Sequence, residues 1–360
     1  MSFEAAPQPI RAMVVDDSAI VRGLIVGMLK ADSRIAVTAS CSNGEMAVAQ
    51  AARKPVDVII LDIEMPVMDG LSALPKLLQA SPGVSIIMAS TLTQRNAAIS
   101  LRALSLGAAD YIAKPTSDRL GASENFQREL IEKVLVLGQA GKSRASPDRQ
   151  GERFARLSPQ PKLQMARPPR MIAIGSSTGG PQALLSILGG LPASVKSPIV
   201  IAQHMPPTFT TVLAQHIAKA SGRSCREAHD GMEIKPGEIC LAPGDYHLEV
   251  TGTMDHSVAR LSQTAPENFC RPSVDPLFRS VARVFGPNGC ALVLTGMGND
   301  GLAGARVMAA AGAPILAQDE ATSVVWGMPG AVANAGLCSA VLPLNRIAHH
   351  LAGLFAREAA

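Results

Sequence analysis

The chain of 360 residues is poor in aromatic residues, has no closely spaced cysteine pair and has no long apolar run. Because only 3% of the residues are aromatic, base stacking on single-stranded nucleic acid is not expected. The six cysteines are scattered without a C-x-x-C pair, so neither a zinc site nor a disulfide framework is expected. No apolar run approaches the length of about 18 residues that a membrane span needs, and the N-terminus lacks the apolar segment of a signal peptide. We therefore expect a soluble, cytoplasmic protein that is not embedded in a membrane.

The formal net charge of +4 is concentrated in one segment. Eight Lys or Arg residues and two acids lie between Gln139 and Arg170, so this segment carries +6 and the rest of the chain −2. A charge excess confined in this way does not indicate a DNA-binding face. The surrounding residues 138–169 are rich in Pro, Gly and Ser and lack a hydrophobic period, which predicts a flexible linker. The alternative is an electrostatic contact with an acidic partner or a membrane surface. The predicted domains are residues 1–137 and 170–360.

The first domain has the alternating pattern of strands and helices that is typical of a parallel, doubly wound α/β sheet. Short apolar runs alternate with helical stretches, as in consecutive βαβ units. The five runs predicted as strands are Ile10–Val15, Ile35–Ala39, Asp57–Leu61, Ser85–Ala89 and Asp110–Ala113.

Polar residues follow four of these strands, and in a parallel sheet such strand ends line one crevice. The residues expected to converge there are Asp16, Asp17, Asp62, Ser90 and Lys114. Three neighbouring carboxylates repel one another unless a cation is present, and oxygen ligands favour Mg²⁺. The set predicts a phosphoryl-acceptor site in which Asp62 attacks, Mg²⁺ and Lys114 neutralise phosphoryl oxygens, and Ser90 hydrogen-bonds one of them.

About residues 10–130 resemble a response-regulator receiver domain. The motifs that carry the resemblance are Val14-Val15-Asp16-Asp17-Ser18, the stretch from Leu61 to Gly70, and Lys114-Pro115. The resemblance implies a flavodoxin-like sheet of strand order 2-1-3-4-5 and phosphorylation of Asp62 by a histidine kinase. It also implies Mg²⁺ held by Asp17, Asp62 and the backbone carbonyl of Glu64, with Asp16 nearby. Ser90 and Tyr111 fall at the family's switch positions.

The second domain opens with a strand, Met171–Ile174, that ends in a glycine-rich turn before a helix beginning near Pro181. Gly175-x-Ser177-x-Gly179 has the spacing of a nucleophile elbow, with Ser177 at its centre. Glycines let the backbone crowd such a turn, and the helix N-terminus offers free N–H groups to a developing anion. The same pattern also fits a phosphate-binding or purely structural turn.

Two later strands each end beside a residue that could complete a hydrolytic site. His204 follows Pro198–Ala202, and Asp300 follows Cys290–Leu294 just before a helix over Leu302–Ala311. These ends face the same side of a parallel sheet as Ser177, so a Ser–His–Asp arrangement is predicted. The order of the three residues along the chain differs from that of α/β-hydrolases. The other histidines look like surface or loop residues: His216, His229, His247, His256, His349 and His350.

Residues 170–357 resemble the CheB family of chemotaxis protein-glutamate methylesterases, and so does the order of receiver, linker and esterase. The resemblance rests on family-specific motifs: Ile174–Gly180, Gln203–Pro207, Leu241–Asp245, Arg271–Asp275, Leu294–Gly301 and Trp326–Pro329. It implies a Rossmann-like, mainly parallel sheet, a triad of Ser177, His204 and Asp300, and an oxyanion hole with the Met297 N–H. Ser176 stands where alanine is common.

The activity implied is hydrolysis of glutamate γ-methyl esters on chemoreceptors, which releases methanol, together with deamidation of receptor glutamines. The hydrolytic step needs no cofactor. The unphosphorylated receiver is expected to cover the mouth of the esterase site and to release it on phosphorylation.

Two other functions fit parts of the sequence. A nucleotide-binding module could use Gly175–Gly180 as a phosphate cradle, but it would not need His204 and Asp300 at neighbouring strand ends. A transcriptional response regulator would need a basic recognition helix after the linker, and the sequence offers none.

Overall fold

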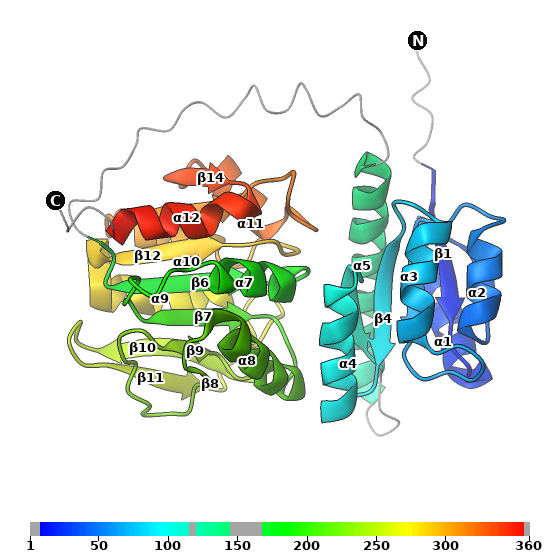
Figure 1. Ribbon diagram of the computed structural model, residues 1–360, viewed down its shortest axis with the longest axis horizontal. Helices are drawn as coiled ribbons and strands as arrows, with labels where there is room; N and C mark the ends of the chain where they lie inside the picture. Colours follow the sequence, from blue (N-terminus) through cyan, green and yellow to red (C-terminus); the bar gives the residue numbers. More distant parts are fainter. Residues whose placement is uncertain (1–7, 115–119, 145–167, 356–360) are drawn as a thin grey trace, which may run out of the picture. The chain divides into compact units, whose positions relative to one another are not determined.

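The computed structural model describes residues 8–114, 120–144 and 168–355. The chain divides into two compact units, Met1–Arg156 and Leu157–Ala360, and each is described by itself. The first is coloured blue to teal in Figure 1, and the second green to red.

The first unit contains a five-stranded sheet in which all pairs are parallel. The strand order is β2-β1-β3-β4-β5, which confirms the predicted doubly wound topology. Its strands are β1 (Ile10–Val15), β2 (Ile35–Cys41), β3 (Val58–Asp62), β4 (Ser85–Ser90) and β5 (Asp110–Ala113).

Each of the first four helices begins at a capping side chain that follows a strand or loop. An oxygen of each cap accepts a backbone N–H that the first helical turn leaves without a helical partner. The caps are Ser18 for α1 (Ala19–Lys30), Asn43 for α2 (Gly44–Ala51), Asp69 for α3 (Gly70–Ala80) and Thr93 for α4 (Gln94–Ser105). The helices lie in two layers, since α1 contacts α5 whereas α3 contacts both α2 and α4.

The last helix of this unit, α5 (Leu120–Arg144), extends seven residues into the predicted linker. Gly138 and Gly141 are buried on α5 rather than exposed in a connector. A Cβ on Gly138 would lie 2.4 Å from a methyl group of Ile10, and one on Gly141 would lie 2.9 Å from the carbonyl oxygen of Gly83. These glycines therefore let α5 approach the sheet closely. Residues 145–167 of the predicted linker lie outside the described residues, and the domain boundaries stay predictions.

The second unit contains a seven-stranded sheet in which every pair is parallel, which confirms the predicted mainly parallel α/β fold. In spatial order its strands are β14 (Ala340–Leu342), β13 (Ile315–Gln318), β12 (Gly289–Val293), β6 (Met171–Ser176), β7 (Ile199–Gln203), β9 (Ile239–Leu241) and β8 (Cys225–Glu227). A separate antiparallel hairpin joins β10 (His247–Gly252) to β11 (Ser257–Ser262).

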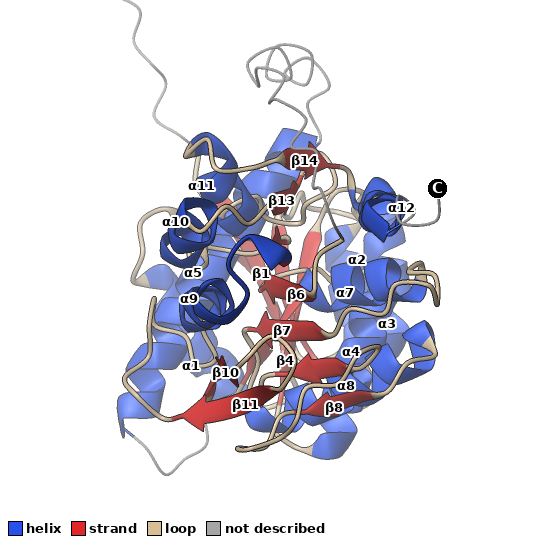
Figure 2. Ribbon diagram, turned by 90° about the vertical axis from the view of Figure 1, so that its left-hand side faces the viewer, coloured by secondary structure: helices blue, strands red, loops and turns tan. Residues whose placement is uncertain are grey.

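Helices cover both faces of this sheet, as Figure 2 shows. One layer holds α7 (Gly180–Gly189), α8 (Pro207–Ser221) and α12 (Leu344–Phe355). The other holds α9 (Val274–Phe285), α10 (Leu302–Ala310) and α11 (Met328–Asn334). The strands β6, β7 and β12 are buried along their whole length, so the core lies on both sides of the central strands.

The chain order reverses between β6 and β12, because later strands add to both sides of this pair. Such a switch point leaves a crevice at the carboxyl ends of the two strands. No helix among the described residues is both long and apolar enough to cross a bilayer.

Candidate active site and phosphoacceptor site

The crevice between β6 and β12 begins at Ser177, directly after β6. Ser177 is half-buried, and its backbone N–H donates to the carbonyl of Thr295 at 3.1 Å. The turn that follows is tight: Gly179 has a φ of 77°, and a Cβ on Gly180 would lie 2.0 Å from Oε1 of Gln203. Only glycine fits such a close approach without displacing its neighbour. The turn therefore brings Ser177 to the edge of the crevice, with α7 beginning three residues later.

The neighbouring hydroxyl of Ser176 has a structural partner. Ser176 is fully buried, and its Oγ donates to Oε1 of Gln203 at 2.6 Å. The amide of Gln203 in turn donates to the carbonyls of Ser177 at 3.0 Å and His204 at 3.2 Å. Ser176 and Gln203 thus tie the end of β6 to the end of β7 and fix the backbone on the β6 side of the crevice.

His204 and Asp300 are in direct contact. Nε2 of His204, which follows β7, lies 2.7 Å from Oδ2 of Asp300, which precedes α10. Asp300 is 2% exposed, and its oxygens also accept hydrogen bonds from Asn268 Nδ2, the Ser273 hydroxyl and the backbone N–H groups of Val274, Asp275 and Gly301. Burial alone would raise the pKa of Asp300, but the contact with His204 and these donors lower it to about 2. Asp300 is therefore a fixed anion beside the imidazole.

The second ring nitrogen of His204 faces a cysteine that the sequence did not single out. Nδ1 lies 3.3 Å from Sγ of Cys270. Burial would lower the pKa of His204, but the charge of Cys270 and the hydrogen bonds with Asp300 and Cys270 raise it to about 10. Among the described residues, Ser177 Oγ forms no hydrogen bond with the imidazole, because Nε2 contacts Asp300 and Nδ1 contacts Cys270. The catalytic roles of Ser177 and His204 therefore stay predictions.

The loop after β12 lies against Ser177. A Cβ on Gly296 would lie 2.9 Å from Cβ of Ser177, and the Thr295 hydroxyl donates to the carbonyl of Thr178 at 2.9 Å. Met297, the predicted oxyanion-hole residue, follows Gly296 in this loop and is half-buried. The loop thus runs beside the turn that carries Ser177.

The position of His247 differs from the prediction that it is a surface or loop residue. It begins β10 and is fully buried rather than lying in a loop. Its Nε2 lies 3.2 Å from the carbonyl of Ala265, and its Nδ1 accepts the N–H of Ser273 at 3.2 Å. Nδ1 thus links β10 to the N-cap of α9, and Nε2 contacts the loop that follows β11. The motif Ala242–Asp245 gave no sign that the strand begins so soon after it.

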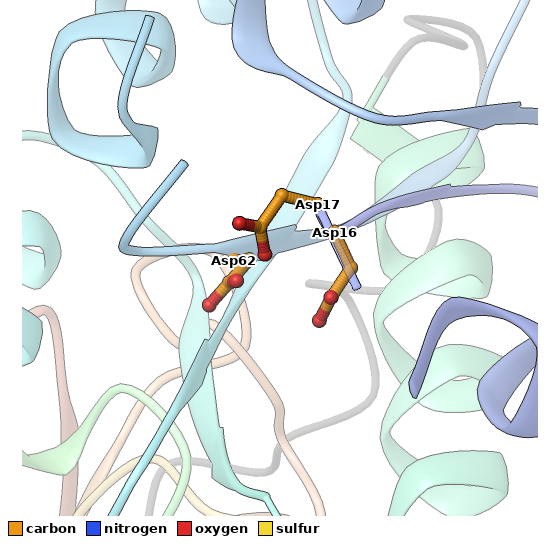
Figure 3. Close-up of side chains that lie close together, drawn as sticks. All are labelled: Asp16, Asp17 and Asp62. Atoms are coloured by element: carbon orange, nitrogen blue, oxygen red, sulfur yellow. The ribbon is translucent and has the colours of Figure 1, made fainter. Parts of the chain in front are cut away.

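In the first unit, three carboxylates gather at the ends of β1 and β3. Asp16, Asp17 and Asp62 each offer one oxygen, and these oxygens lie within 4.8 Å of one another (Figure 3). Nζ of Lys114 lies 2.7 Å from an oxygen of Asp16 and 2.7 Å from one of Asp62. One lysine offsets only part of three negative charges, and the hard oxygen donors suit Mg²⁺. The residues present therefore fit a divalent cation.

Burial and charge act in opposite directions on this cluster. Burial raises the pKa of Asp62 although the hydrogen bond from Lys114 lowers it. Burial would lower the pKa of Lys114, but its hydrogen bonds with Asp16 and Asp62 raise it. Lys114 is thus held as a cation at the predicted acceptor carboxylate.

The remaining residues predicted for the receiver lie around the same strand ends. Ser90 ends β4 and is buried, and its hydroxyl donates to the carbonyl of Thr91 at 3.1 Å. Tyr111 is buried on β5, where Nζ of Lys133 lies 5.2 Å from its ring centroid. Glu64 is exposed two residues after Asp62, in the loop that follows β3.

Comparison with known proteins agrees with both units. Residues 172–351 match the family model described as CheB methylesterase, and residues 12–122 match the response regulator receiver domain. A protein-glutamate methylesterase/protein-glutamine glutaminase 1 of Paramagnetospirillum magneticum is 52% identical, and the match covers 98% of each chain. A protein-glutamate methylesterase/protein-glutamine glutaminase of Azospirillum brasilense is 51% identical, and the match covers 99% of this chain and 95% of that one.

A solved structure resembles the second unit. The crystal structure of the Thermotoga maritima CheB methylesterase catalytic domain matches with 39% identity and a TM-score of 0.50, over 52% of this chain and 98% of that one. The chain belongs to the CheB family of protein-glutamate methylesterase/protein-glutamine glutaminases, with a response-regulator receiver domain preceding the methylesterase domain.

Proposed function

We propose that this protein demethylates glutamate methyl esters and deamidates glutamines on chemoreceptors, with Ser177 as nucleophile, His204 as base and Asp300 as the orienting carboxylate. The observation that carries the proposal is the 2.7 Å contact between His204 and Asp300 at the switch point beside half-buried Ser177. A nucleotide-binding module would have no use for a buried imidazole–carboxylate pair at this place. The family relationship supports the substrate class.

In the proposed mechanism Asp300 holds the Nε2–H of His204, so Nδ1 is the basic nitrogen. Nδ1 leaves Cys270 and takes the proton of Ser177 as Oγ attacks the ester carbonyl carbon. The carbonyl oxygen becomes an oxyanion near the Met297 N–H. When the C–O bond to the methoxy group breaks, the imidazolium gives its proton to the leaving oxygen and methanol departs. Water then attacks the acyl-enzyme with His204 again as base, which yields glutamate and free Ser177.

Deamidation follows the same route with a different leaving group. Ser177 attacks the glutamine amide, and the imidazolium of His204 protonates the departing nitrogen so that it leaves as ammonia. Hydrolysis of the same acyl-enzyme again yields glutamate. One site therefore accounts for both activities in the relatives' names.

The receiver domain regulates the esterase activity. Asp62 accepts a phosphoryl group from a histidine kinase, while Lys114 and the Ser90 hydroxyl contact its oxygens. Asp16, Asp17, Asp62 and the carbonyl of Glu64 would hold Mg²⁺, which when bound neutralises phosphoryl oxygens. Tyr111 lies buried on β5 close to Lys133, where repacking on phosphorylation can alter the surface of the receiver. The proposed organisation is a cytoplasmic protein with domains at 1–137 and 170–360 and a linker between them.

The test compares two adjacent hydroxyls. Ser177→Ala should lower methanol release from methylated receptor membranes by about 10³-fold or more, because the nucleophile is gone. Ser176→Ala is the matched control, since the Ser176 hydroxyl donates to Gln203, and it should stay within about tenfold of wild type. Full activity in Ser177→Ala would contradict the proposal.

A further inference from the structure

A tight turn over Glu267–Cys270 lies directly on the proposed catalytic pair. The N–H of Glu267 donates to the carbonyl of Cys270 at 3.2 Å, and the reverse bond measures 2.9 Å. Its two central residues, Asn268 and Phe269, have φ values of 52° and 62°. Positive φ at both central positions is the backbone of a type I′ turn, for which Asn-Gly is the preferred pair. Asn268 fits that preference, whereas Phe269 adopts a conformation that a bulky side chain rarely takes.

Hydrogen bonds and ion pairs hold the residues around Phe269 in place. Glu267 forms a two-pronged ion pair with Arg279, with N–O distances of 3.0 and 2.6 Å. Asn268 donates to both Asp275 and Asp300, Cys270 contacts His204, and Arg271 pairs with Asp245. A strained residue persists only where its surroundings fix the backbone so firmly, and such residues cluster at functional sites.

Phe269 itself is 80% exposed. Its backbone conformation counts against stability, and glycine at this position would remove that cost. One neighbour touches the carboxylate of the catalytic pair and the other touches its imidazole, so Phe269 lies beside the proposed hydrolytic site. The contacts of its two neighbours therefore hold an exposed aromatic side chain at a fixed place beside the catalytic pair.

We propose that Phe269 is a substrate-docking residue that packs against apolar side chains of the chemoreceptor helix beside the modified glutamate. This inference rests on the proposed function, since a protein substrate must cover the rim of the site around Ser177. A helix that presents one glutamate also presents its neighbours three and four residues away on the same face, and an exposed ring held rigidly can pack between them. A small soluble ester has no such neighbours and reaches Ser177 without needing the ring.

The deciding variant is Phe269→Gly in the full chain, assayed with a phosphodonor present. The melting temperature should rise by a few degrees, because Asn-Gly relaxes the turn. Demethylation of receptor membranes should lose about tenfold or more in kcat/KM, as at an interface residue that carries binding energy. Hydrolysis of a γ-methyl glutamate ester in a short soluble peptide should stay within about twofold of wild type.

Two further variants separate the ring from the backbone. Phe269→Leu keeps an apolar side chain in the same conformation and should retain most receptor activity, whereas Phe269→Asn should lose as much as glycine. Met254→Ala removes another exposed apolar side chain of this unit and should leave both substrates unaffected. Equal losses with receptor and small ester, or unchanged receptor demethylation in Phe269→Gly, would overturn the inference. If Ser177→Ala kept its activity, the proposed function itself would fail, and this result is distinguishable from either of those.

Discussion

The proposed acceptor site of the receiver and the proposed hydrolytic site of the second unit occupy the same position in two unlike sheets. Both lie at the carboxyl ends of parallel strands where the strand order reverses. The acceptor site holds three carboxylates against one lysine and keeps an excess of negative charge. The hydrolytic site holds one carboxylate against one imidazole. The first is therefore suited to a cation and a phosphoryl group, and the second to proton transfer.

Two buried aspartates show what causes this difference. Asp62 is 6% exposed and has a raised pKa, whereas Asp300 is only 2% exposed and has a lowered pKa. Burial acts in the same direction on both. Asp62 pairs with one lysine and accepts one backbone N–H. The oxygens of Asp300 accept hydrogen bonds from the start of α9 and from Asn268, and one of them contacts His204. Burial raises the pKa of a buried carboxylate unless the fold supplies enough donors to outweigh it, as it does for Asp300 but not for Asp62.

The largest expected effect is the loss of all activation in Asp62→Asn. An amide cannot accept a phosphoryl group as a carboxylate does, so phosphate transfer from the kinase should be abolished while basal ester hydrolysis remains. Labelled phosphate incorporation and methanol release measure the two separately. Asp69→Asn is the control, because Asp69 only caps α3 and asparagine caps a helix equally well. Normal phosphorylation of Asp62→Asn would remove Asp62 from the acceptor role.

Asp300→Asn tests the other site. An amide cannot stabilise the imidazolium or hold the same tautomer of His204, and kcat should fall by about 10⁴-fold. Single-turnover hydrolysis of the methyl ester near pH 8 measures this loss, and phosphorylation of Asp62 should be unchanged. Asp255→Asn alters an exposed carboxylate that pairs with Arg170 and should cost little. A loss of less than tenfold in Asp300→Asn would show that the contact with His204 is structural.

The comparison also shows which features the sequence could reveal. Asp16, Asp62, Ser90 and Lys114 each follow an apolar run predicted as a strand, so strand ends alone predict that they lie together. Glu64 and Tyr111 came only from the family resemblance. His204 and Asp300 were found in the same way, and the structure joins them at 2.7 Å. Strand ends in a parallel sheet are predictable neighbours because the topology fixes which edge they share.

Contacts made by loops could not be found in this way. Asn268 and Cys270 lie in a turn after the β10–β11 hairpin, with no periodicity that links them to the crevice. Cys270 directly precedes the motif Arg271–Asp275, and its place beside that motif was the one available signal. Gly138 and Gly141 indicated a linker, but a helix that packs closely on a sheet also needs glycine, and the sequence alone does not separate these uses.

Cys270→Ala should shift the pH profile of the hydrolytic site. The charge of Cys270 and its hydrogen bond raise the pKa of His204, and the base must be neutral to accept the proton of Ser177. Removing the thiol should lower that pKa, so the rising limb of kcat/KM should move to lower pH by about one unit or more. Measuring kcat/KM for a small ester between pH 6 and 11 locates this rising part of the profile. Cys225→Ala, in β8, is the matched control, and superimposable profiles for Cys270→Ala and wild type would contradict the prediction.

The smallest effect expected is selective stabilisation of the acidic site by Mg²⁺. A cation bound between Asp16, Asp17 and Asp62 relieves their repulsion, and tenfold saturation stabilises the folded receiver by about 1.4 kcal/mol, or a few degrees in Tm. Trp326 is the only tryptophan and lies in the second unit, so its fluorescence follows the unfolding of that unit while calorimetry follows both. Mg²⁺ should shift the receiver transition alone, and matched ionic strength from NaCl should not. Asp17→Asn should abolish the shift, and an equal shift of the Trp326 transition would show that Mg²⁺ does not discriminate between the two sites.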